Sequence, residues 1–377
     1  MPGSSGLAYS DLYLRYDFGV HHPLRPIRIK LTVDLISAIA NQSGKSFTVL
    51  EPGEASKDEI LLFHDLEYVN RIEEASKRGR GLLDAGDTPA FQGCFEASAK
   101  IVGGSLELAR KIINGELDHG FNPGGGLHHA HRDSASGFCI FNDPAVTVSL
   151  LKNEGLKRIV YLDIDAHHGD GVMYGFYGDK TLLDIDFHEN GRFLFPGTGF
   201  PDETGQGEAS GLKINMPFPP GTCDRQYLDA FDGIVPKLIR RFRPGFILLQ
   251  AGADSHGGDP LTHMNLTTHS YQHIVREVHK LSHDLCEGRM LLFGGGGYNL
   301  ANVARCWTVA FAEISGIGLP ESLPEEWRRV IEKAGVTPAP SRVHDPEPST
   351  SQDDRISRDV NSSIGDLRGL IPMLREE

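Results

Sequence analysis

Residues 158–170 have the sequence RIVYLDIDAHHGD, and the fold depends on the change of character within this stretch. Its first eight residues are an apolar run rich in β-branched side chains. Such a run is typical of a strand that is buried on both faces of a parallel sheet. Acidic and imidazole side chains follow at once. Because open α/β sheets bind ligands beyond the carboxyl ends of their strands, this order predicts a functional site at the strand's end.

The same pattern recurs along the chain. Further apolar runs are predicted to be strands, at 181–188 (TLLDIDFH), 245–254 (GFILLQAGAD) and 290–293 (MLLF). Helices are predicted between them, one opened by Asp143 as its N-cap and closed at Gly155, one capped by Asp224 and kinked at Pro236, and one from Thr268 or Ser270 to a stop at Gly288. This alternation predicts a single open, mainly parallel sheet with helices on both faces, an α/β fold of three layers.

Composition excludes several classes of protein. The chain has 377 residues, 39% of them hydrophobic and 23% charged, which is enough for one large core. Its net charge of −14 argues against direct nucleic-acid binding, because phosphate contacts need clustered Lys and Arg. The five cysteines are scattered without a C-x-x-C pair, so we expect reduced thiols. No long apolar segment is present, and we expect a cytoplasmic protein without a membrane anchor.

The two ends of the chain differ from its middle. We expect a catalytic domain over residues 1–320 and a C-terminal extension over 321–377, in which 338–363 is a linker rich in Pro, Ser and Asp. A capping box at Ser363 predicts a short helix after it, which packs on the body or on a second copy in a homo-oligomer. Residues 2–6 are interpreted as a flexible start or as residues foreign to the native chain, and are set outside the predicted fold.

Asp165-x-His167 is the strongest local motif. Side chains at i and i+2 at a strand end point the same way, so a carboxylate and an imidazole can share one cation. Asp254, at the end of another predicted strand, is the best third ligand. Two Asp and one His leave a fourth position open, as a catalytic zinc site requires. Taken alone, the motif also fits a helix cap or a simple Asp–His pair.

Neighbouring residues supply partners for such a site. Asp163 and Asp170 flank the motif, and His128-His129 follow a glycine run that lets the backbone approach closely. Two His–Asp pairs beside one metal would provide a general base and an electrostatic partner. Tyr298, after four glycines, could donate its hydroxyl to a developing oxyanion, although a core aromatic is the commoner role.

Taken together, these segments closely resemble the zinc-dependent histone deacetylase superfamily. The resemblance rests on GGGLHHA (124–130), SGFCIFND (136–143), DIDAHHGDG (163–171), FPGTG (195–199) and GGGGY (294–298). YDFG (16–19), His22-Pro23 and HENGR (188–192) are similar to its prokaryotic acetoin-utilisation (AcuC-type) branch. The match extends over about residues 8–318, and it implies a fold like that of arginases and deacetylases.

The resemblance implies a role for each matching residue. Asp165, His167 and Asp254 would bind Zn²⁺, with Fe²⁺ as a possible replacement, and His129 with Asp170 would act as the general base. His128 with Asp163 would be the electrostatic partner, and Tyr298 would polarise the acyl carbonyl. The remaining roles concern substrate and product: Gly137, Phe138, Phe195, Leu261 and Gly296 at the acyl-lysine tunnel, Asp87 at its rim, and Arg28 in the channel for the acid product.

The resemblance also implies a structural K⁺ site. Its ligands would come from Asp163, Asp165, His167 and Phe187, together with a serine that is replaced here by Asp186. A carboxylate at that position adds negative charge near the zinc ligands. It would tighten the ion's binding, change the ion's identity or carry a proton.

Three alternatives stay open beside an acetyl-lysine deacetylase acting on protein. The nearest is a deacylase of small acylated amines such as acetylpolyamines, on the same site. An arginase-like ureohydrolase would need two manganese ions and further bridging carboxylates, which the spacing around Asp170 and Asp254 does not provide. A non-catalytic acyl-lysine-binding module would be expected to lack a ligand or the tyrosine, and all are present.

Overall fold

The apolar run at residues 158–165 contains a central strand of the fold. In the computed structural model, which describes residues 4–348 and 353–375, eight strands form one sheet in the order β2-β1-β3-β8-β7-β4-β5-β6. Every pairing between neighbours is parallel. The strands are β1 (Ser5–Ala8), β2 (Thr48–Leu50), β3 (His119–Asn122), β4 (Ile159–Asp163), β5 (Leu182–Glu189), β6 (Lys213–Phe218), β7 (Phe246–Gln250) and β8 (Met290–Phe293). The predicted α/β class with an open parallel sheet is confirmed.

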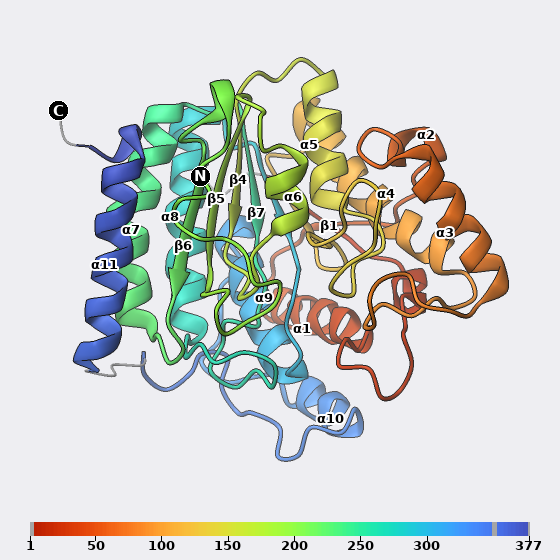
Figure 1. Cartoon of the computed structure of the whole chain (residues 1–377). Coiled ribbons are helices and arrows are strands. Elements are labelled where there is room, and N and C mark those ends of the chain that lie inside the picture. Colours follow the sequence, from red (N-terminus) through yellow and green to blue (C-terminus); the bar gives the residue numbers. More distant parts are fainter. Residues whose placement is uncertain (1–3, 349–352, 376–377) are drawn as a thin grey trace.

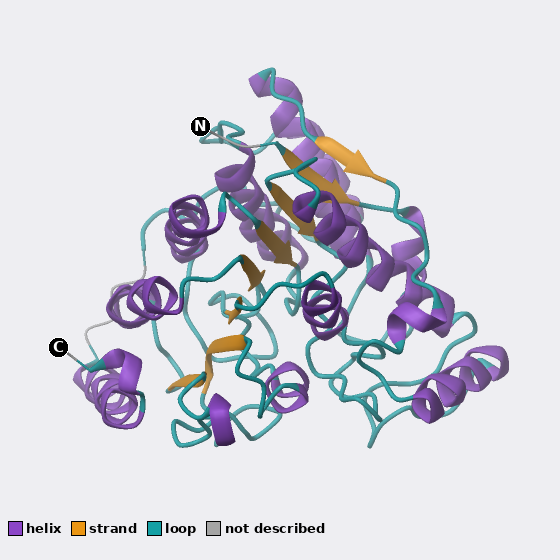
Figure 2. Cartoon of the chain, turned by 90° about the horizontal axis from the view of Figure 1, so that it is seen from above, coloured by secondary structure: helices purple, strands orange, loops and turns teal. Residues whose placement is uncertain are grey.

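Helices cover both faces of this sheet (Figures 1 and 2). The α-helices are α1 (Ile27–Ser43), α2 (Lys57–Ile60), α3 (Leu66–Arg78), α4 (Cys94–Ile113), α5 (Asp143–Asn153), α6 (Asp170–Gly175), α7 (Asp224–Phe242), α8 (Thr268–Cys286), α9 (Leu300–Ser315), α10 (Glu325–Lys333) and α11 (Asp354–Leu370). Short 3₁₀ helices are η1 (Asp11–Arg15), η2 (Gly207–Ala209) and η3 (Pro372–Leu374). Buried side chains of α1, α7, α8 and α9 form one core cluster, and those of α3, α4 and α5 form the other. Helices therefore form a layer on each face of the sheet, which gives the predicted three-layer arrangement.

The strands that the sequence did not reveal are short or lie towards one side of the sheet. β1, β2, β3 and β6 were not predicted, because β1, β2 and β3 have no more than four residues each, and β1, β3 and β6 contain Gly, His or Lys. The interpretation of residues 2–6 as lying outside the fold is wrong for Ser5 and Gly6, which pair with β3. A side chain at Gly6 would collide with Leu117, so the strand needs glycine there. Pro2 and Gly3 lie outside the described residues.

Three predicted helix caps lie before the predicted residue in the chain. The side chain of Asn142, and not that of Asp143, accepts the capping hydrogen bond at the start of α5, from the backbone N–H of Ala145 at 2.9 Å. The cap of α7 is Cys223 and that of α8 is Thr267. Asp143 is buried and serves another purpose, since its carboxylate accepts hydrogen bonds from backbone groups beside the candidate site.

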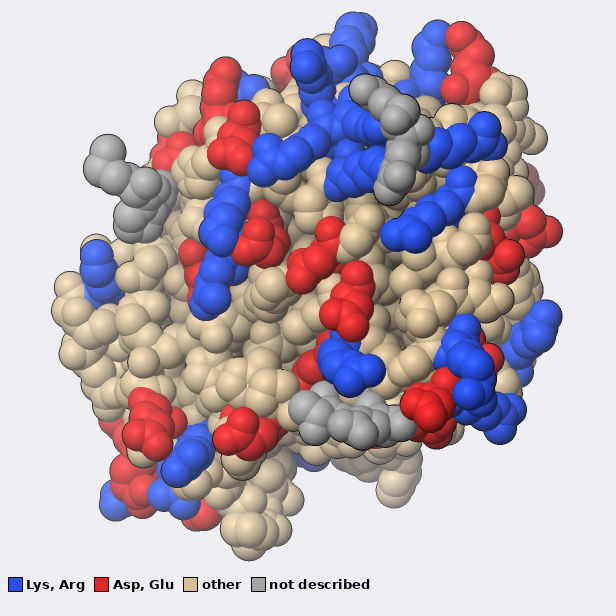
Figure 3. All heavy atoms as spheres, turned by 90° about the vertical axis from the view of Figure 1, so that its left-hand side faces the viewer, with Lys and Arg blue, Asp and Glu red and all other residues tan. Residues whose placement is uncertain are grey.

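The C-terminal extension is more helical than predicted. α10 was not predicted, and α11 begins at Asp354 instead of after Ser363, which lies inside the helix. The proposed linker over 338–363 is thus partly helix, and its residues 349–352 lie outside the described part. α11 contacts α7 and β6, and it forms one side of the molecule in Figure 1. Lys and Arg gather towards one edge of that side (Figure 3).

Asp345 joins the extension to the body. One carboxylate oxygen, Oδ2, lies 3.0 Å from His256 Nε2 and accepts both the backbone N–H and the hydroxyl of Thr268, each at 2.9 Å. The other oxygen accepts a hydrogen bond from Arg305 at 2.9 Å. Burial alone would raise the pKa of Asp345, but the hydrogen bond from His256 and the charge of Arg305 hold it well below its ordinary value.

We expect Asp345→Ala to lower the free energy of unfolding by about 2 kcal/mol, because several buried donors would lose their acceptor. A group with a depressed pKa stabilises the fold above its unfolded pKa, and this contribution is lost as the pH falls. The difference from wild type should therefore be full at pH 7 and shrink below about pH 4. Chemical denaturation of variant and wild type, at pH 7 and again below about pH 4, measures this difference in the free energy of unfolding. Glu347→Ala, at an exposed position nearby, is the control, and equal effects of the two variants would contradict the assignment.

Among the described residues, no helix is both long and apolar enough to cross a membrane. The five cysteines all lie in the described part of the chain, are buried and form no disulfide, in line with the prediction of reduced thiols.

Candidate active site

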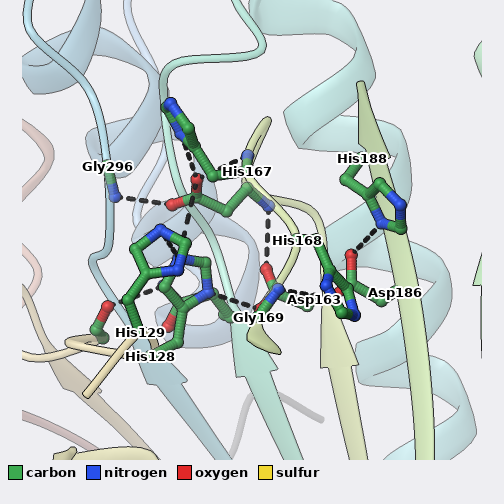
Figure 4. A network of polar contacts seen from close by, with 12 residues as sticks. His128, His129, Asp163, His167, His168, Gly169, Asp186, His188 and Gly296 are labelled. Carbon is green, nitrogen blue, oxygen red and sulfur yellow. Dashed lines mark hydrogen bonds and ion pairs between the residues drawn. The ribbon is translucent and has the colours of Figure 1, made fainter. Parts of the chain in front are cut away.

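The predicted site residues lie where strands of the sheet end. β3 is followed by the loop that carries His128 and His129, β4 by Asp165 and His167, β7 by Asp254, and β8 by the glycine run that leads to Tyr298. Since all strands are parallel, these carboxyl ends meet at one edge of the sheet. Figure 4 shows several of these side chains converging from separate segments.

Three potential metal ligands converge at this edge. Ligand atoms of Asp165, His167 and Asp254 all lie within 4.8 Å of one another, and the three residues are buried. Nδ1 of His167 is 2.9 Å from Asp254 Oδ2 and 3.2 Å from Asp165 Oδ1. The simple alternative of an isolated Asp–His pair does not describe this arrangement, because two carboxylates from different strand ends face the same ring nitrogen.

Backbone groups orient both carboxylates. Oδ2 of Asp165 accepts a hydrogen bond from Gly296 N–H at 2.6 Å, and Oδ1 of Asp254 accepts one from Ala166 N–H at 2.8 Å. Each acid therefore has one oxygen fixed by the backbone and the other directed at His167. A side chain at Gly296 would overlap the Asp254 carboxylate, which explains the glycine there. Two carboxylate oxygens and one imidazole nitrogen are donors that suit Zn²⁺ or Fe²⁺, so the residues fit such an ion.

His128 forms the deeper of two His–Asp pairs. Its Nδ1 lies 2.7 Å from Asp163 Oδ2, which also accepts a hydrogen bond from the hydroxyl of Tyr161 at 2.7 Å. Asp163 Oδ1 accepts the backbone N–H of Asp165 at 3.0 Å. These donors favour the ionised carboxylate, but burial outweighs them and raises the pKa of Asp163 to about 7. Burial alone would lower the pKa of His128, but the charges of Asp163 and Asp165 outweigh burial and raise it to about 10. The raised pKa of His128 favours its protonated form at neutral pH.

His129 forms the second pair and has the opposite electrostatics. Its Nδ1 lies 2.7 Å from Asp170 Oδ1, while Nε2 of His131 lies 3.3 Å from the other oxygen of the same carboxylate. Burial, reinforced by the charge of His128, lowers the pKa of His129 to about 4. The Nε2 atoms of His128 and His129 are 3.1 Å apart. One protonated and one neutral imidazole thus face the same space, a pairing suited to acid–base catalysis.

Tyr298 lies on the other side of the ligand cluster. Its ring centroid is 6.5 Å from that of His167 and 5.9 Å from that of Phe138. Its backbone N–H donates to Asp259 Oδ2 at 2.7 Å, so the position of the ring depends on this acid. Burial raises the pKa of Tyr298 well above its ordinary value, which keeps the phenol protonated and able to donate.

A narrow cavity of about 20 Å³ joins these groups. Its lining includes His128, His129, His167 and Tyr298, together with Gly137 and Phe138. A side chain at Gly137 would collide with the rings of His129 and Phe195, so only glycine allows them to come together. The Phe195 ring centroid is 5.0 Å from that of His129, and this side chain is 44% exposed. Phe195 is not itself a lining residue of the cavity, but it packs against His129, which is one.

Arg28 belongs to the lining of the same cavity. It is buried and donates a hydrogen bond to the Gly297 carbonyl at 2.8 Å. Its guanidinium carbon lies over the ring of Trp307, 5.2 Å from the ring centroid.

Asp87 is exposed, and its backbone carbonyl lies 3.1 Å from Nε2 of His22, whose ring packs on Phe138. Leu261 is half-buried but does not belong to the described cavity lining.

Asp186 occupies a neighbouring buried position. It pairs in register with Asp163, and its carboxylate accepts the backbone N–H of Gly169 at 2.7 Å while lying 2.6 Å from Nδ1 of His188 (Figure 4). Both of its oxygens therefore already have partners. The side chain of Phe187, on the same strand, belongs to the hydrophobic core. A K⁺ site that uses Asp186 and Phe187 remains a prediction.

Several residues that shape the site were missed. Asp143 holds the backbone N–H groups of Gly126 and Leu127, each at 2.9 Å through Oδ1, and so fixes the loop before His128. Asp259 positions Tyr298, and Tyr161 supports Asp163. Only Tyr161 had a usable signal, because it lies two residues before Asp163 on the same strand face.

The comparisons with known proteins agree with this geometry. The histone deacetylase domain matches residues 22–314. The chain belongs to the histone deacetylase family. The acetoin utilization protein AcuC of Bacillus subtilis is 38% identical over 350 residues, which cover 90% of this chain and 89% of that protein. AcuC of Staphylococcus xylosus is also 38% identical, over 87% of each chain.

Solved structures of histone deacetylase relatives share the fold. The crystal structure of an HDAC homologue from Aquifex aeolicus has a TM-score of 0.83 at 27% identity, covering 96% of this chain and 100% of that one. The HDA15 HD domain has a TM-score of 0.80 at 27% identity, covering 98% of each. The histone deacetylase membership predicted from sequence is confirmed, and with it a hydrolase of the deacetylase class. The ureohydrolase and the non-catalytic module are not supported by these matches.

Proposed function

We propose that this deacetylase hydrolyses the amide of acetyl-lysine, in a protein or in a small acylated amine, with Asp165, His167 and Asp254 holding Zn²⁺ or Fe²⁺. The observation that carries the proposal is the pair of imidazoles beside the three-ligand cluster, one protonated and one neutral. Each imidazole contacts a carboxylate through Nδ1, and both line the same narrow cavity. Amide hydrolysis needs a base for the water and an acid for the leaving amine, and this arrangement offers both.

The ion, when bound, would polarise the acyl carbonyl and make a water molecule nucleophilic at neutral pH. His129 would accept that water's proton on Nε2, since its Nδ1 is engaged by Asp170. The C–O bond forms as the water adds to the carbonyl carbon, and the Tyr298 hydroxyl would donate a hydrogen bond to the developing oxyanion. His128 would then give its Nε2 proton to the amine nitrogen as the C–N bond breaks.

The surrounding residues suggest how substrate and product are handled. Gly137, Phe138 and Phe195 would line the passage for the aliphatic stem, and a neutral acyl-amine enters an apolar passage at lower desolvation cost than a charged free amine. Asp87 would hold the substrate at the rim. Arg28, a buried cation in the lining of the cavity, would attract the small carboxylate product.

A direct assay tests the proposal. Purified protein is stripped with a chelator, reloaded with Zn²⁺ or Fe²⁺, and offered an acetyl-lysine peptide or acetylated polyamines in parallel. We expect the stripped protein to lose nearly all hydrolysis and the reloaded protein to regain it with about one catalytic ion per chain. Higher kcat/KM for the peptide would favour protein substrates, and higher kcat/KM for the polyamines would favour small amines. Absence of hydrolysis of both by metal-loaded protein would overturn the proposal.

A further inference from the structure

Three histidines converge at the edge of the sheet opposite the active site. His119 is the first residue of β3 and pairs in register with Met290, the first residue of β8. His279 and His283 lie one turn apart on α8, so they share a helix face. The active-site residues follow the carboxyl ends of these strands, whereas this trio lies at their amino ends. It plays no part in the chemistry proposed above.

The ring nitrogens of the trio approach one another closely. Nε2 of His279 lies 3.0 Å from Nε2 of His119 and 3.0 Å from Nε2 of His283. A neutral ring nitrogen carries either one proton or one lone pair, so Nε2 of His279 can form one good hydrogen bond and not two. A cation shared by the three lone pairs satisfies all of them. Ligand nitrogens around a tetrahedral Zn²⁺ with ~2.05 Å bonds are ~3.3 Å apart, close to the spacing seen here.

The local packing holds the rings in this arrangement. Ring centroids are 4.5 Å apart for His119 and His279, 5.1 Å for His119 and His283, and 4.8 Å for His279 and His283. Gly288, with a positive φ of 83°, brings the turn after α8 against the rings of His119 and His283, where a side chain would crowd both. The geometry is therefore built by three elements and does not depend on one flexible side chain.

The protonation state also suits metal binding. Burial and the neighbouring imidazoles lower the pKa of His119 to about 3, and burial with the charge of His283 lowers that of His279 to about 4. Both rings are neutral at physiological pH and have lone pairs to offer. His119 is buried, His279 is half-buried and His283 is exposed, so an ion can enter from solvent on the His283 side.

We propose that His119, His279 and His283 form a second metal site that binds Zn²⁺ or a chemically similar divalent transition-metal ion. Imidazole-only ligand sets favour such ions over Mg²⁺ or Ca²⁺, which prefer oxygen. Three ligands leave the fourth position for water. The bound ion joins β3 to α8 and stabilises the folded chain.

Zinc stoichiometry is the decisive measurement. Untagged, full-length protein is dialysed against buffered Zn²⁺, and bound metal is quantified for wild type and for His279→Ala/His283→Ala. We expect the double variant to bind one ion fewer per chain than wild type. His273→Ala is the matched control, because His273 lies on the same helix but pairs with Asp232. Equal stoichiometry in wild type and double variant would overturn the site, whatever the active site binds.

Two further readouts separate this site from the catalytic one. His283→Ala removes an exposed ligand and should fold normally, with zinc affinity of the second site at least ~10-fold weaker. Deacetylase turnover at saturating catalytic metal should be unchanged in this variant. Added Zn²⁺ should raise the Tm of wild type by a few degrees more than that of the double variant. An equal Tm rise in both proteins would contradict a stabilising second ion.

Discussion

Tyr298→Phe is expected to lower kcat by about 10²–10³-fold while leaving the bound catalytic metal unchanged. The substitution removes one hydroxyl and keeps the ring that packs near Phe138 and His167. A donor aimed at an oxyanion acts mainly in the transition state, so KM should change far less than kcat. The measurement is steady-state kinetics on an acetyl-lysine substrate, with metal analysis of the same sample.

Asp259→Asn provides a graded companion to that experiment. Asp259 holds the backbone N–H of Tyr298 without lining the cavity, and the amide oxygen of Asn can still accept that hydrogen bond. A loss much smaller than that of Tyr298→Phe is expected. If Tyr298→Phe instead loses metal or unfolds, the tyrosine is structural and its proposed role fails.

His129→Gln is expected to lower kcat by about 10²–10⁴-fold, the range found when a general base is removed. His129 is the neutral imidazole of the pair, and its Asp170 partner fixes the tautomer whose Nε2 faces the cavity. Gln keeps hydrogen-bonding capacity but cannot take a proton at neutral pH. Kinetics at several pH values measure the loss, which should persist across the neutral range.

His131→Gln is the control for that variant. His131 contacts the same carboxylate of Asp170, at 3.3 Å, but does not belong to the cavity lining. It should retain most of the activity. Similar losses in the two variants would mean that disturbing Asp170, and not removal of the base, explains the effect.

The sequence predicted the central part of the fold well. The strands that became β4, β5, β7 and β8 are buried on both faces, and such strands have continuous apolar runs. β1 and β2 lie towards one side of the sheet and lack such runs, so their pairing with β3 comes from tertiary contacts and not from pattern. The helix α11 was placed too late because polar residues of its exposed face resemble a linker.

The candidate site was predicted to a similar extent. Motif spacing and the family resemblance identified the residues that converge, including His128, His129 and Tyr298. Spacing could not identify Asp259 or Asp143, because their roles depend on backbone N–H groups that only the folded chain brings near them. The cluster of His119, His279 and His283 was missed because His119 lies 160 residues before His279 in the chain, and only the fold brings them together.

The strand order has a consequence for synthesis of the chain. Among the strands of the described residues, β8 is the last in sequence, yet it lies between β3 and β7 and is the only link between two half-sheets, β2-β1-β3 and β7-β4-β5-β6. A nascent chain that has not yet produced residues 290–293 therefore presents two separate partial sheets, each with an unpaired inner edge open to wrong partners. Tyr298 follows β8, so the tyrosine proposed to act in catalysis is synthesised only after this strand. The ribosome must finish most of the polypeptide before the enzyme can acquire activity.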